Sequence, residues 1–378
     1  MQCSAKILCG ATLLLAAGGA LAQSSVTLYG IADAFVQYLN NGGRTSYSQR
    51  SGGAAGSRIG LVGKEDLGGG LEAKFDVETG YNLNNGSLFS DTTTLFYRQA
   101  WVGLFDRKYG SLTFGRQYQP TFTVVYGADP FGLSETLSPL SAAVLAIDRN
   151  TLSTQSITGR TSNAMLYQSP DVGGLRLYAM YAFAATVAQP VPASTGNVLD
   201  LAATYTGHGL YAGFAYQYQH PGTETIAVGP FSSLNLVATE HFTGAFTYSF
   251  GIVNFQLVYT YARPKDASHS SAAASVGAAH PVSIAQIGAT IQATPVDVIE
   301  VAGLERNVRG SHDNTPAIEL GYDHFLSKRT SLYVRAGYMK NNGTAITSWP
   351  GIRVVTPTGA PDFGASQTLV AAGISHRF

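Results

Sequence analysis

The chain has 378 residues, of which only 12% are charged, and its 23 Lys and Arg residues balance 23 Asp and Glu residues. This charged share is about half of that in an ordinary soluble domain, and the balanced charge argues against a nucleic-acid partner. No run of about 18 apolar residues follows the N-terminal segment, so we expect no membrane-spanning helix.

Residues 1–22 have the composition of a secretory signal. Lys6 precedes an apolar run, and Ala20-Leu21-Ala22 has the small-x-small pattern at which such segments are cleaved. We expect cleavage after Ala22, which leaves residues 23–378 as one mature domain. Both cysteines fall in the removed segment, so we expect neither a disulfide nor a cysteine-bound metal in the mature protein.

The mature region repeats one unit, a segment of about ten residues in which apolar and polar side chains alternate. This period-two pattern, rich in Tyr, Phe, Val and Leu, is typical of β-strands. Sixteen such segments are predicted, and they begin near Val26, Gly56, Gly70, Thr93, Gly110, Gly159, Gly174, Val198, Leu210, Thr239, Ile252, Val282, Val296, Asn314, Thr330 and Gln367.

The connections between these segments are of two kinds. Short ones such as Asp66–Gly69 carry turn residues, and we expect them to alternate strictly with long ones rich in Gly, Ser, Ala and Pro. The long ones include Leu39–Ala55, Gln119–Thr158, His220–Ala238, Arg263–Pro281 and Asn341–Ser366. This alternation favours an all-β fold, a transmembrane antiparallel β-barrel of sixteen strands with one rim in the periplasm.

The stretch EAKFDVETG indicates which face of the barrel is polar. Four charged residues share one face of this strand: Glu72, Lys74, Asp76 and Glu78. Phe75 and Val77 share the other face. Four charges in a packed core would be costly, so we expect them in an aqueous lumen and the apolar face toward lipid. The strand at 296–306 mixes Val and Glu on one face, and its facing is left open.

Five stretches of the mature chain occur in a familiar order. They are SSVTLYGIADAFVQY, SRIGLVGKEDLGGGLEAKFDVETGYN, RQAWVGLFDRKYGSLTFGRQYQP, GRTSNAMLYQSPDVGGLRLYAMYAF and the terminal AAGISHRF. Together they resemble the Gram-negative general diffusion porins, most closely the beta-proteobacterial branch, over essentially the whole mature chain. The resemblance implies a homotrimeric, multi-pass outer-membrane protein that contacts lipid and lipopolysaccharide, passes small hydrophilic solutes and needs no cofactor.

The resemblance also gives a role to the C-terminal residue. In this family a terminal aromatic residue, here Phe378, is recognised by the barrel assembly machinery during insertion. His376 departs from the family pattern, in which Tyr or another hydrophobic residue is commoner, but we do not expect this to block insertion.

In this family the third long loop folds into the barrel and narrows it, which implies that role for residues 119–158. The acids of this loop are Asp129, Glu135 and Asp148, and the resemblance implies that one or two of them face arginines across the pore. We single out Asp129 and Glu135. Which one lines the pore is left open, because GADPFGLSE differs from the enteric pattern and either acid could instead pin the loop to the wall.

The predicted wall of the constriction holds three arginines. Strand parity places Arg58 and Arg160 in the lumen, and the family pattern sets Arg98 inward with Trp101 outward. These arginines match the family's cluster opposite the loop, and Lys74 is predicted to join them. The alternative is that the arginines only pair with lumen acids and hold the wall together.

Arg116 shares strand parity with Leu112 and Phe114, so it is predicted to point outward. A charge toward lipid costs up to about 2–4 kcal/mol at the bilayer midplane, and a contact with another subunit would relieve that cost. We therefore predict a trimer contact for Arg116, with snorkelling to the rim as the alternative.

The leading functional hypothesis is a passive channel for small hydrophilic solutes and ions, not an enzyme. The arginines favour anions, whereas Glu72, Asp76 and Glu78 favour cations; we predict a mild anion preference, because charges at the narrowest point act at the shortest range. The alternatives are a substrate-specific channel that binds organic anions, a barrel-based adhesin or enzyme, and a soluble β-sandwich. The chain shows no compact metal, phosphate-loop or nucleophile-elbow motif.

Overall fold

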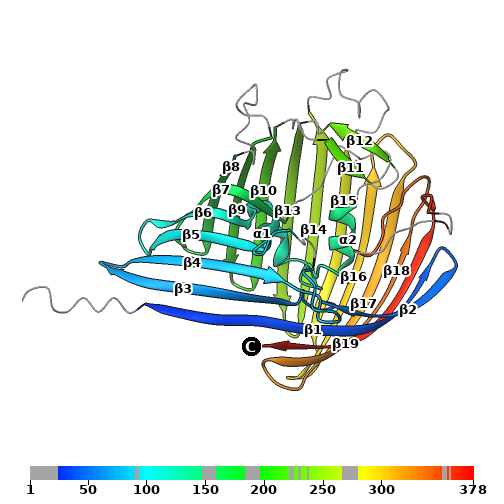
Figure 1. Ribbon diagram of the computed structural model, residues 1–378, viewed down its shortest axis with the longest axis horizontal. Coiled ribbons are helices and arrows are strands. Elements are labelled where there is room, and N and C mark those ends of the chain that lie inside the picture. The colour runs from blue at the N-terminus through cyan, green and yellow to red at the C-terminus, as the bar shows by residue number, and fades with distance from the viewer. Residues whose placement is uncertain are drawn as a thin grey trace, which may run out of the picture.

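The computed structural model describes residues 24–89, 93–146, 159–183, 196–220, 225–228, 231–235, 238–265, 280–350, 356 and 359–378. Within these ranges one sheet of 17 strands contains most of the chain (Figure 1). Its strands are β1 (Ser25–Asn41), β2 (Arg44–Ser51), β3 (Arg58–Gly68), β4 (Leu71–Gly80), β5 (Gln99–Asp106), β6 (Gly110–Tyr118), β7 (Arg160–Gln168), β8 (Leu175–Ala182), β9 (Val198–Gly207), β10 (Leu210–Gln219), β13 (Thr239–Phe250), β14 (Val253–Pro264), β15 (Val282–Gln292), β16 (Asp297–Val308), β17 (Asn314–Phe325), β18 (Thr330–Lys340) and β19 (Ser366–Arg377). A separate hairpin consists of β11 (Thr225–Val228) and β12 (Phe231–Asn235).

The sheet closes on itself because β1 pairs with β19, the last strand, as well as with its neighbours in sequence. One edge of β1 pairs with β3 along Ser25–Ile31 and with β2 along Ala34–Asn41. β2 and β3 therefore act as one interrupted strand, and the fold is a closed antiparallel barrel of sixteen strands, as predicted. The backbone of Phe378 completes the closure, since its N–H and carbonyl both bond to Gly30.

The first predicted long connection is wrong. Residues 39–55 do not form a loop, because β1 continues to Asn41 and β2 returns from Arg44. Gly42 and Gly43, both at positive φ, form the two-residue turn between them, as expected for a tight hairpin. Strict alternation also fails at residues 309–313, where a short connection joins β16 and β17 on the long-loop rim, and the strand predicted near Thr93 begins at Gln99.

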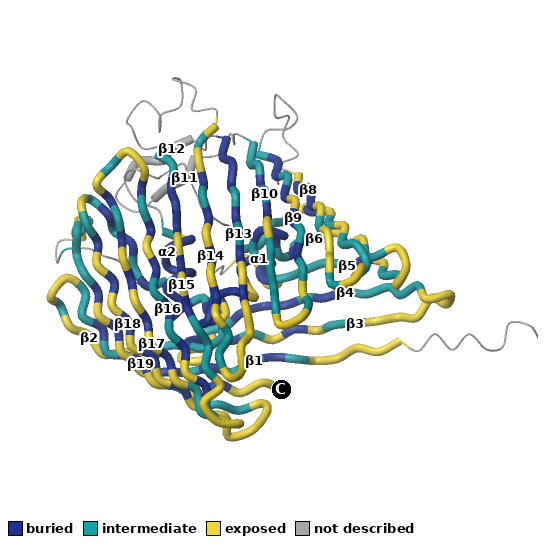
Figure 2. The backbone as a smooth tube through the Cα atoms, turned by 180° about the vertical axis from the view of Figure 1, so that it is seen from behind, coloured by how far each residue is buried: buried dark blue, intermediate teal, exposed yellow. Residues whose placement is uncertain are grey.

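The two faces of the barrel wall differ as expected for a lipid-exposed exterior. Outward side chains such as Phe75, Leu104 and Phe255 are exposed, whereas the alternate inward positions are buried (Figure 2). The facing of β16 is now defined: Glu300 and Leu304 point inward and are buried, while Ile299 and Glu305 point outward. Among the described residues, no helix is long and apolar enough to cross a membrane.

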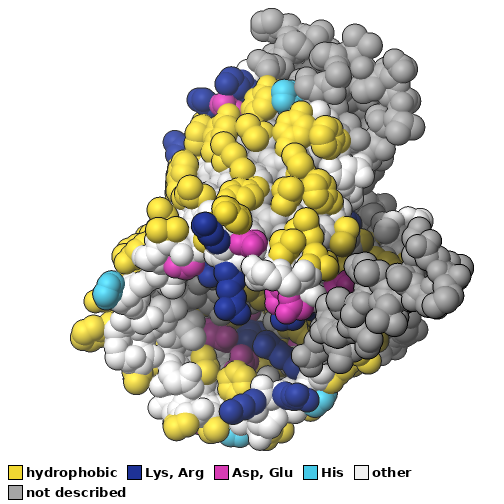
Figure 3. All heavy atoms as spheres, turned by 90° about the vertical axis from the view of Figure 1, so that its left-hand side faces the viewer, with side chains coloured by type: hydrophobic (Ala, Val, Ile, Leu, Met, Phe, Trp, Pro, Cys, Tyr) yellow, Lys and Arg dark blue, Asp and Glu magenta, His cyan; other side chains and the backbone are white. Residues whose placement is uncertain are grey.

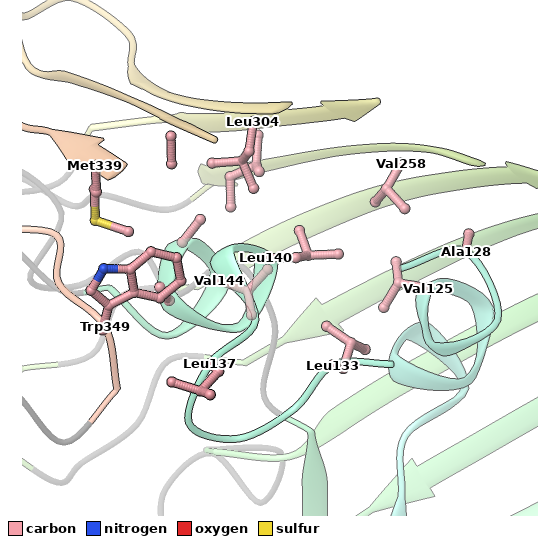
Figure 4. Close-up of a cluster of buried hydrophobic side chains, with 14 of the residues drawn as sticks. Val125, Ala128, Leu133, Leu137, Leu140, Val144, Val258, Leu304, Met339 and Trp349 are labelled. Carbon is pink, nitrogen blue, oxygen red and sulfur yellow. The ribbon is translucent and has the colours of Figure 1, made fainter. Parts of the chain in front are cut away.

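The connection after β6 folds into the barrel and carries two short helices, α1 (Pro120–Tyr126) and α2 (Pro139–Leu145). α1 packs on β9, β10 and β13, and α2 packs on β15 to β17. Leu137 and Leu140 of this loop form an apolar cluster with inward residues of the far wall and with Trp349 from the connection before β19 (Figure 4). An apolar core therefore lies inside the barrel, where the sequence predicted a polar surface.

Candidate functional site

The loop after β6 crosses the lumen and is attached at both walls. At one wall Glu135 contacts arginines, and the Ser134 hydroxyl donates to the Gly53 carbonyl. At the other wall Pro130 lies over Gly288 of β15 and Phe131 lies over Gly321 of β17; a Cβ at either glycine would meet these rings at 2.5 and 2.8 Å. Because the loop is attached at both walls, it spans the lumen between them.

The three predicted arginines converge at the first of these attachments. Arg98 Nε lies 2.6 Å from Glu78 Oε1, and its Nη1 lies 2.5 Å from Glu135 Oε2. Arg160 Nη1 lies 3.1 Å from the other oxygen of Glu135. Arg58 Nη1 is 3.9 Å from Glu78 Oε2, too far for a good hydrogen bond. The cluster is thus a network of three arginines and two carboxylates, in which Arg58 makes the longest ion pair.

Strand order explains why residues so distant in sequence meet. Arg58 and Arg160 begin β3 and β7, and Arg98 directly precedes β5. These three strands run in the same direction along the barrel axis, so their first residues point to the same end of the barrel, and Arg58 lies at the break between β2 and β3. Arg98 stands ahead of its strand and does not follow the strand's parity. Trp101 faces the lumen, contrary to the prediction, because it pairs with Asp76 and cross-strand partners share a face.

The two loop acids have opposite environments. Burial acts to raise the pKa of Glu135, but the nearby Arg98, Arg160 and Arg58 guanidiniums outweigh burial and hold the pKa at about 2. Burial raises the pKa of Asp129 above its ordinary value, although hydrogen bonds from Gln286 and from the loop itself oppose the rise. Glu135 is therefore a firmly ionised group, whereas Asp129 is a buried one that takes up a proton more readily.

Asp129 does not contact the arginines. Its carboxylate accepts hydrogen bonds from the Leu133 N–H at 2.7 Å, from the Ser138 hydroxyl at 2.8 Å and from Gln286 Nε2 of β15 at 2.8 Å. These bonds fasten the loop to itself and to the wall. Asp148, the third acid of the loop, lies outside the described residues.

A cavity of about 260 Å³ opens beside the arginine network. The charged residues that line it are Arg58, Arg98, Arg160, Arg377 and Glu135. We call it the arginine cavity. Four cations against one acid give it a positive field, while Glu78 stands behind the arginines. Figure 3 shows a hollow on one face of the molecule in which basic and acidic side chains gather.

The other predicted lumen charges share one face of β4 with Glu78, the member of that set that joins the arginine network. Lys74 pairs with Glu72 at 2.8 Å and lies over the Phe105 ring, so the structure does not bring it to the arginines. Glu72 also pairs with Lys64. Asp76 and Glu78 are buried rather than bathed in water, and they share the single proton of the Tyr29 hydroxyl, which lies 2.8 Å from Asp76 Oδ1 and 3.2 Å from Glu78 Oε2.

Arg116 lies at a bulge between β6 and β7. Its Nε donates to the Tyr97 carbonyl, and its Nη1 donates to the Ser162 hydroxyl at 2.9 Å. The guanidinium thus finds acceptors within its own chain. A subunit contact is not needed to satisfy these two donors, and the trimer contact stays a prediction.

Sequence reasoning missed two parts of the lumen. Arg377 reaches the arginine cavity because it pairs with Ile31, an inward position of β1. On the opposite wall Arg335 bonds Glu300 at 3.0 Å and Asp323 at 2.9 Å, with Glu319 fully buried nearby. The alternation of each strand predicts that these side chains point inward, but the sequence does not show which residues they contact.

The fold and the site together define an outer-membrane channel protein: a sixteen-stranded barrel, apolar outside, with a charged lumen narrowed by an inward loop. Residues 10–344 match the family described as Gram-negative porin, and the chain belongs to that family. It is therefore a passive diffusion channel of the outer membrane.

Two curated relatives are similar over almost their whole length. Outer membrane porin protein 32 of Delftia acidovorans is 28% identical, with 99% of both chains covered. An outer membrane porin of Bordetella pertussis is also 28% identical, with 99% of this chain and all of the relative covered. Among solved structures, the anion-selective porin from Comamonas acidovorans is 26% identical, with a TM-score of 0.76 over 94% of this chain and 100% of that chain.

Proposed function

We propose that this porin passes small hydrophilic solutes with a weak preference for anions, and that Arg58, Arg98 and Arg160 set this preference. The observation that carries the proposal is the arginine cavity, where four arginines face one lining carboxylate at the point narrowed by the loop. A similar structure is named an anion-selective porin, which supports the same sign. Charges at the narrowest point of the lumen have the largest effect on ion selectivity. Elsewhere ions pass at a greater distance, and salt screens the field of a charge over about 8–10 Å.

The first test is the zero-current potential of the purified protein in a planar bilayer under a KCl gradient. We expect reversal toward the chloride potential. Arg58→Gln should move it toward zero, because the 3.9 Å contact with Glu78 is the only ion pair of Arg58 among the described residues and leaves its charge less neutralised than those of Arg98 and Arg160. Arg176→Gln is the matched control, since Arg176 pairs with Asp171 outside the cavity. Reversal of the wild type toward the potassium potential would overturn the anion preference.

The assembly and its partners are part of the proposal. We propose a homotrimer, exported with residues 1–22 as its signal, inserted with the help of the Phe378 signal and surrounded by lipid and lipopolysaccharide. Exposed apolar side chains on outward positions of the strands support the lipid contact. Conductance steps that occur in threes would support the trimer, and single uniform steps would contradict it.

A further inference from the structure

Three aromatic rings form a continuous ladder that leads away from the arginines. Phe122 and Tyr126 lie four residues apart on α1 and therefore on one face of the helix, with Tyr118 just before it. The ring centroids of Tyr118 and Phe122 are 4.9 Å apart and nearly parallel, and those of Phe122 and Tyr126 are 5.9 Å apart. All three residues line the arginine cavity.

The opposite face of α1 already has its packing partners. Val124 and Val125 are fully buried among the inward residues of the barrel wall. Tyr126, by contrast, is 57% exposed, and Phe122 is only partly buried. Phe122 therefore packs partly against the core and partly faces the cavity, whereas Tyr126 presents its ring surface to the cavity.

The ladder meets the cations at Tyr118. The guanidinium of Arg160 lies 4.3 Å from the centroid of this ring, and its Nη2 donates to the hydroxyl at 2.5 Å. Arg58, which lines the same cavity, donates one hydrogen bond from its Nε to the Gly56 carbonyl. Among the described residues, Arg377 makes no ion pair within 4 Å. A carboxylate entering the cavity thus finds guanidinium donors not fully used by Glu135, next to an aromatic surface.

We propose that the arginine cavity is a binding site for small aromatic carboxylates. The carboxylate is held by Arg58 and Arg377, whose planar forks match its geometry, and the ring of the ligand packs on Phe122 and Tyr126. A cavity of about 260 Å³ lies just below the usual range of ligand pockets and suits a single ring. This inference rests on the proposed anion passage and names the class of anion that the site retains longest.

The test compares two carboxylates of similar size, benzoate and cyclohexanecarboxylate, as blockers of the chloride current through single channels. Both carry one charge, but only benzoate has a π face. We expect the half-blocking concentration of benzoate to be about five-fold lower than that of cyclohexanecarboxylate, as a stacking contact would give. Equal half-blocking concentrations in the wild type would overturn the proposal.

Substitutions in the aromatic ladder test whether these rings cause the preference for benzoate over cyclohexanecarboxylate. Phe122→Leu combined with Tyr126→Leu should abolish the difference between the two carboxylates, and the exposed Tyr126→Leu alone should reduce it. Tyr109→Leu, which removes an exposed ring outside the cavity, should leave the ratio as in the wild type. A preference that survives the double substitution would overturn the proposed ladder. Folding of each variant is checked by heat-modifiable migration in detergent gels.

The zero-current potential in the same membranes separates this inference from the proposed function. A chloride-selective channel without a benzoate preference would leave the proposed function intact and remove only the aromatic site. A potassium-selective channel that neither carboxylate blocks would remove both.

Discussion

Two acidic side chains of the inward loop, Asp129 and Glu135, are anchored at opposite walls of the barrel, and the two anchors differ. Glu135 ends between Arg98 and Arg160, where charge holds the loop. Asp129 ends among an amide, a hydroxyl and a backbone N–H, where neutral donors hold it. The same residue type therefore serves two purposes. At one wall the charge is part of the field that an ion meets, and at the other it is sealed from the lumen.

The largest expected effect is at the charged anchor. Arg98→Met would leave Glu78 and Glu135 without their shared cation, and Arg98 and Glu78 are almost completely buried. Removing one partner of a buried ion pair costs about 3–5 kcal/mol. Urea unfolding in lipid vesicles should show a loss of that size. Arg176→Met, at a partly exposed pair, should change stability by less than about 0.5 kcal/mol; equal losses in the two variants would contradict a charged anchor.

At the neutral anchor, we expect stability to depend on whether residue 129 keeps a hydrogen-bonding side chain, and not on its charge. Asp129→Ala leaves three buried donors without an acceptor, which costs about 1–3 kcal/mol. Asp129→Asn should cost clearly less, because Gln286 Oε1 has no partner among the described residues and can accept from the new amide after Gln286 turns over. Unfolding of the two variants, measured side by side, checks this order.

The two anchors should also differ in their effect on ion selectivity. Asp129→Asn should leave the zero-current potential unchanged, whereas Glu135→Gln should move it further toward chloride by removing the one acid that lines the cavity. A shift of similar size in both variants would show that Asp129 also faces the ions.

Much of the barrel could be predicted from the sequence, because the period of two and the turn residues are local signals. The same signals fail where packing over long distances decides. β2 reads RTSYSQRS, which has no apolar face, so its pairing with β1 was not visible. Val258, Ile284 and Leu304 are apolar side chains on inward positions, and they are buried under the loop instead of lining water.

The site shows the same division. The inward facing of Arg58 follows from its strand, and the convergence of three arginines follows from strand order. The separate roles of Asp129 and Glu135 do not, because Gln286 and Arg98 lie far from them in sequence. Only the fold shows which wall each acid reaches.

The smallest expected effect is the pH response of the charged anchor. The pKa of Glu135 is lowered from 4.5 to about 2, so its contribution to stability is complete above about pH 4.5 and is lost as the pH falls through 2. Asp129 has a raised pKa and takes up its proton first, away from the cavity. The contribution of Glu135 to the selectivity should therefore stay constant from pH 7 to about 3, and the chloride preference should rise as Glu135 is neutralised below that.

Arg58→Gln sharpens this prediction, since Arg58 is one of the three cations that lower the pKa of Glu135. Without it, the rise in chloride preference should begin at a higher pH, whereas Arg176→Gln should leave the midpoint where it is. The measurement is the zero-current potential as a function of pH for the three proteins. A wild-type midpoint near pH 4.5 would mean that the arginines do not hold Glu135 ionised, and that the two anchors of the loop are electrostatically alike.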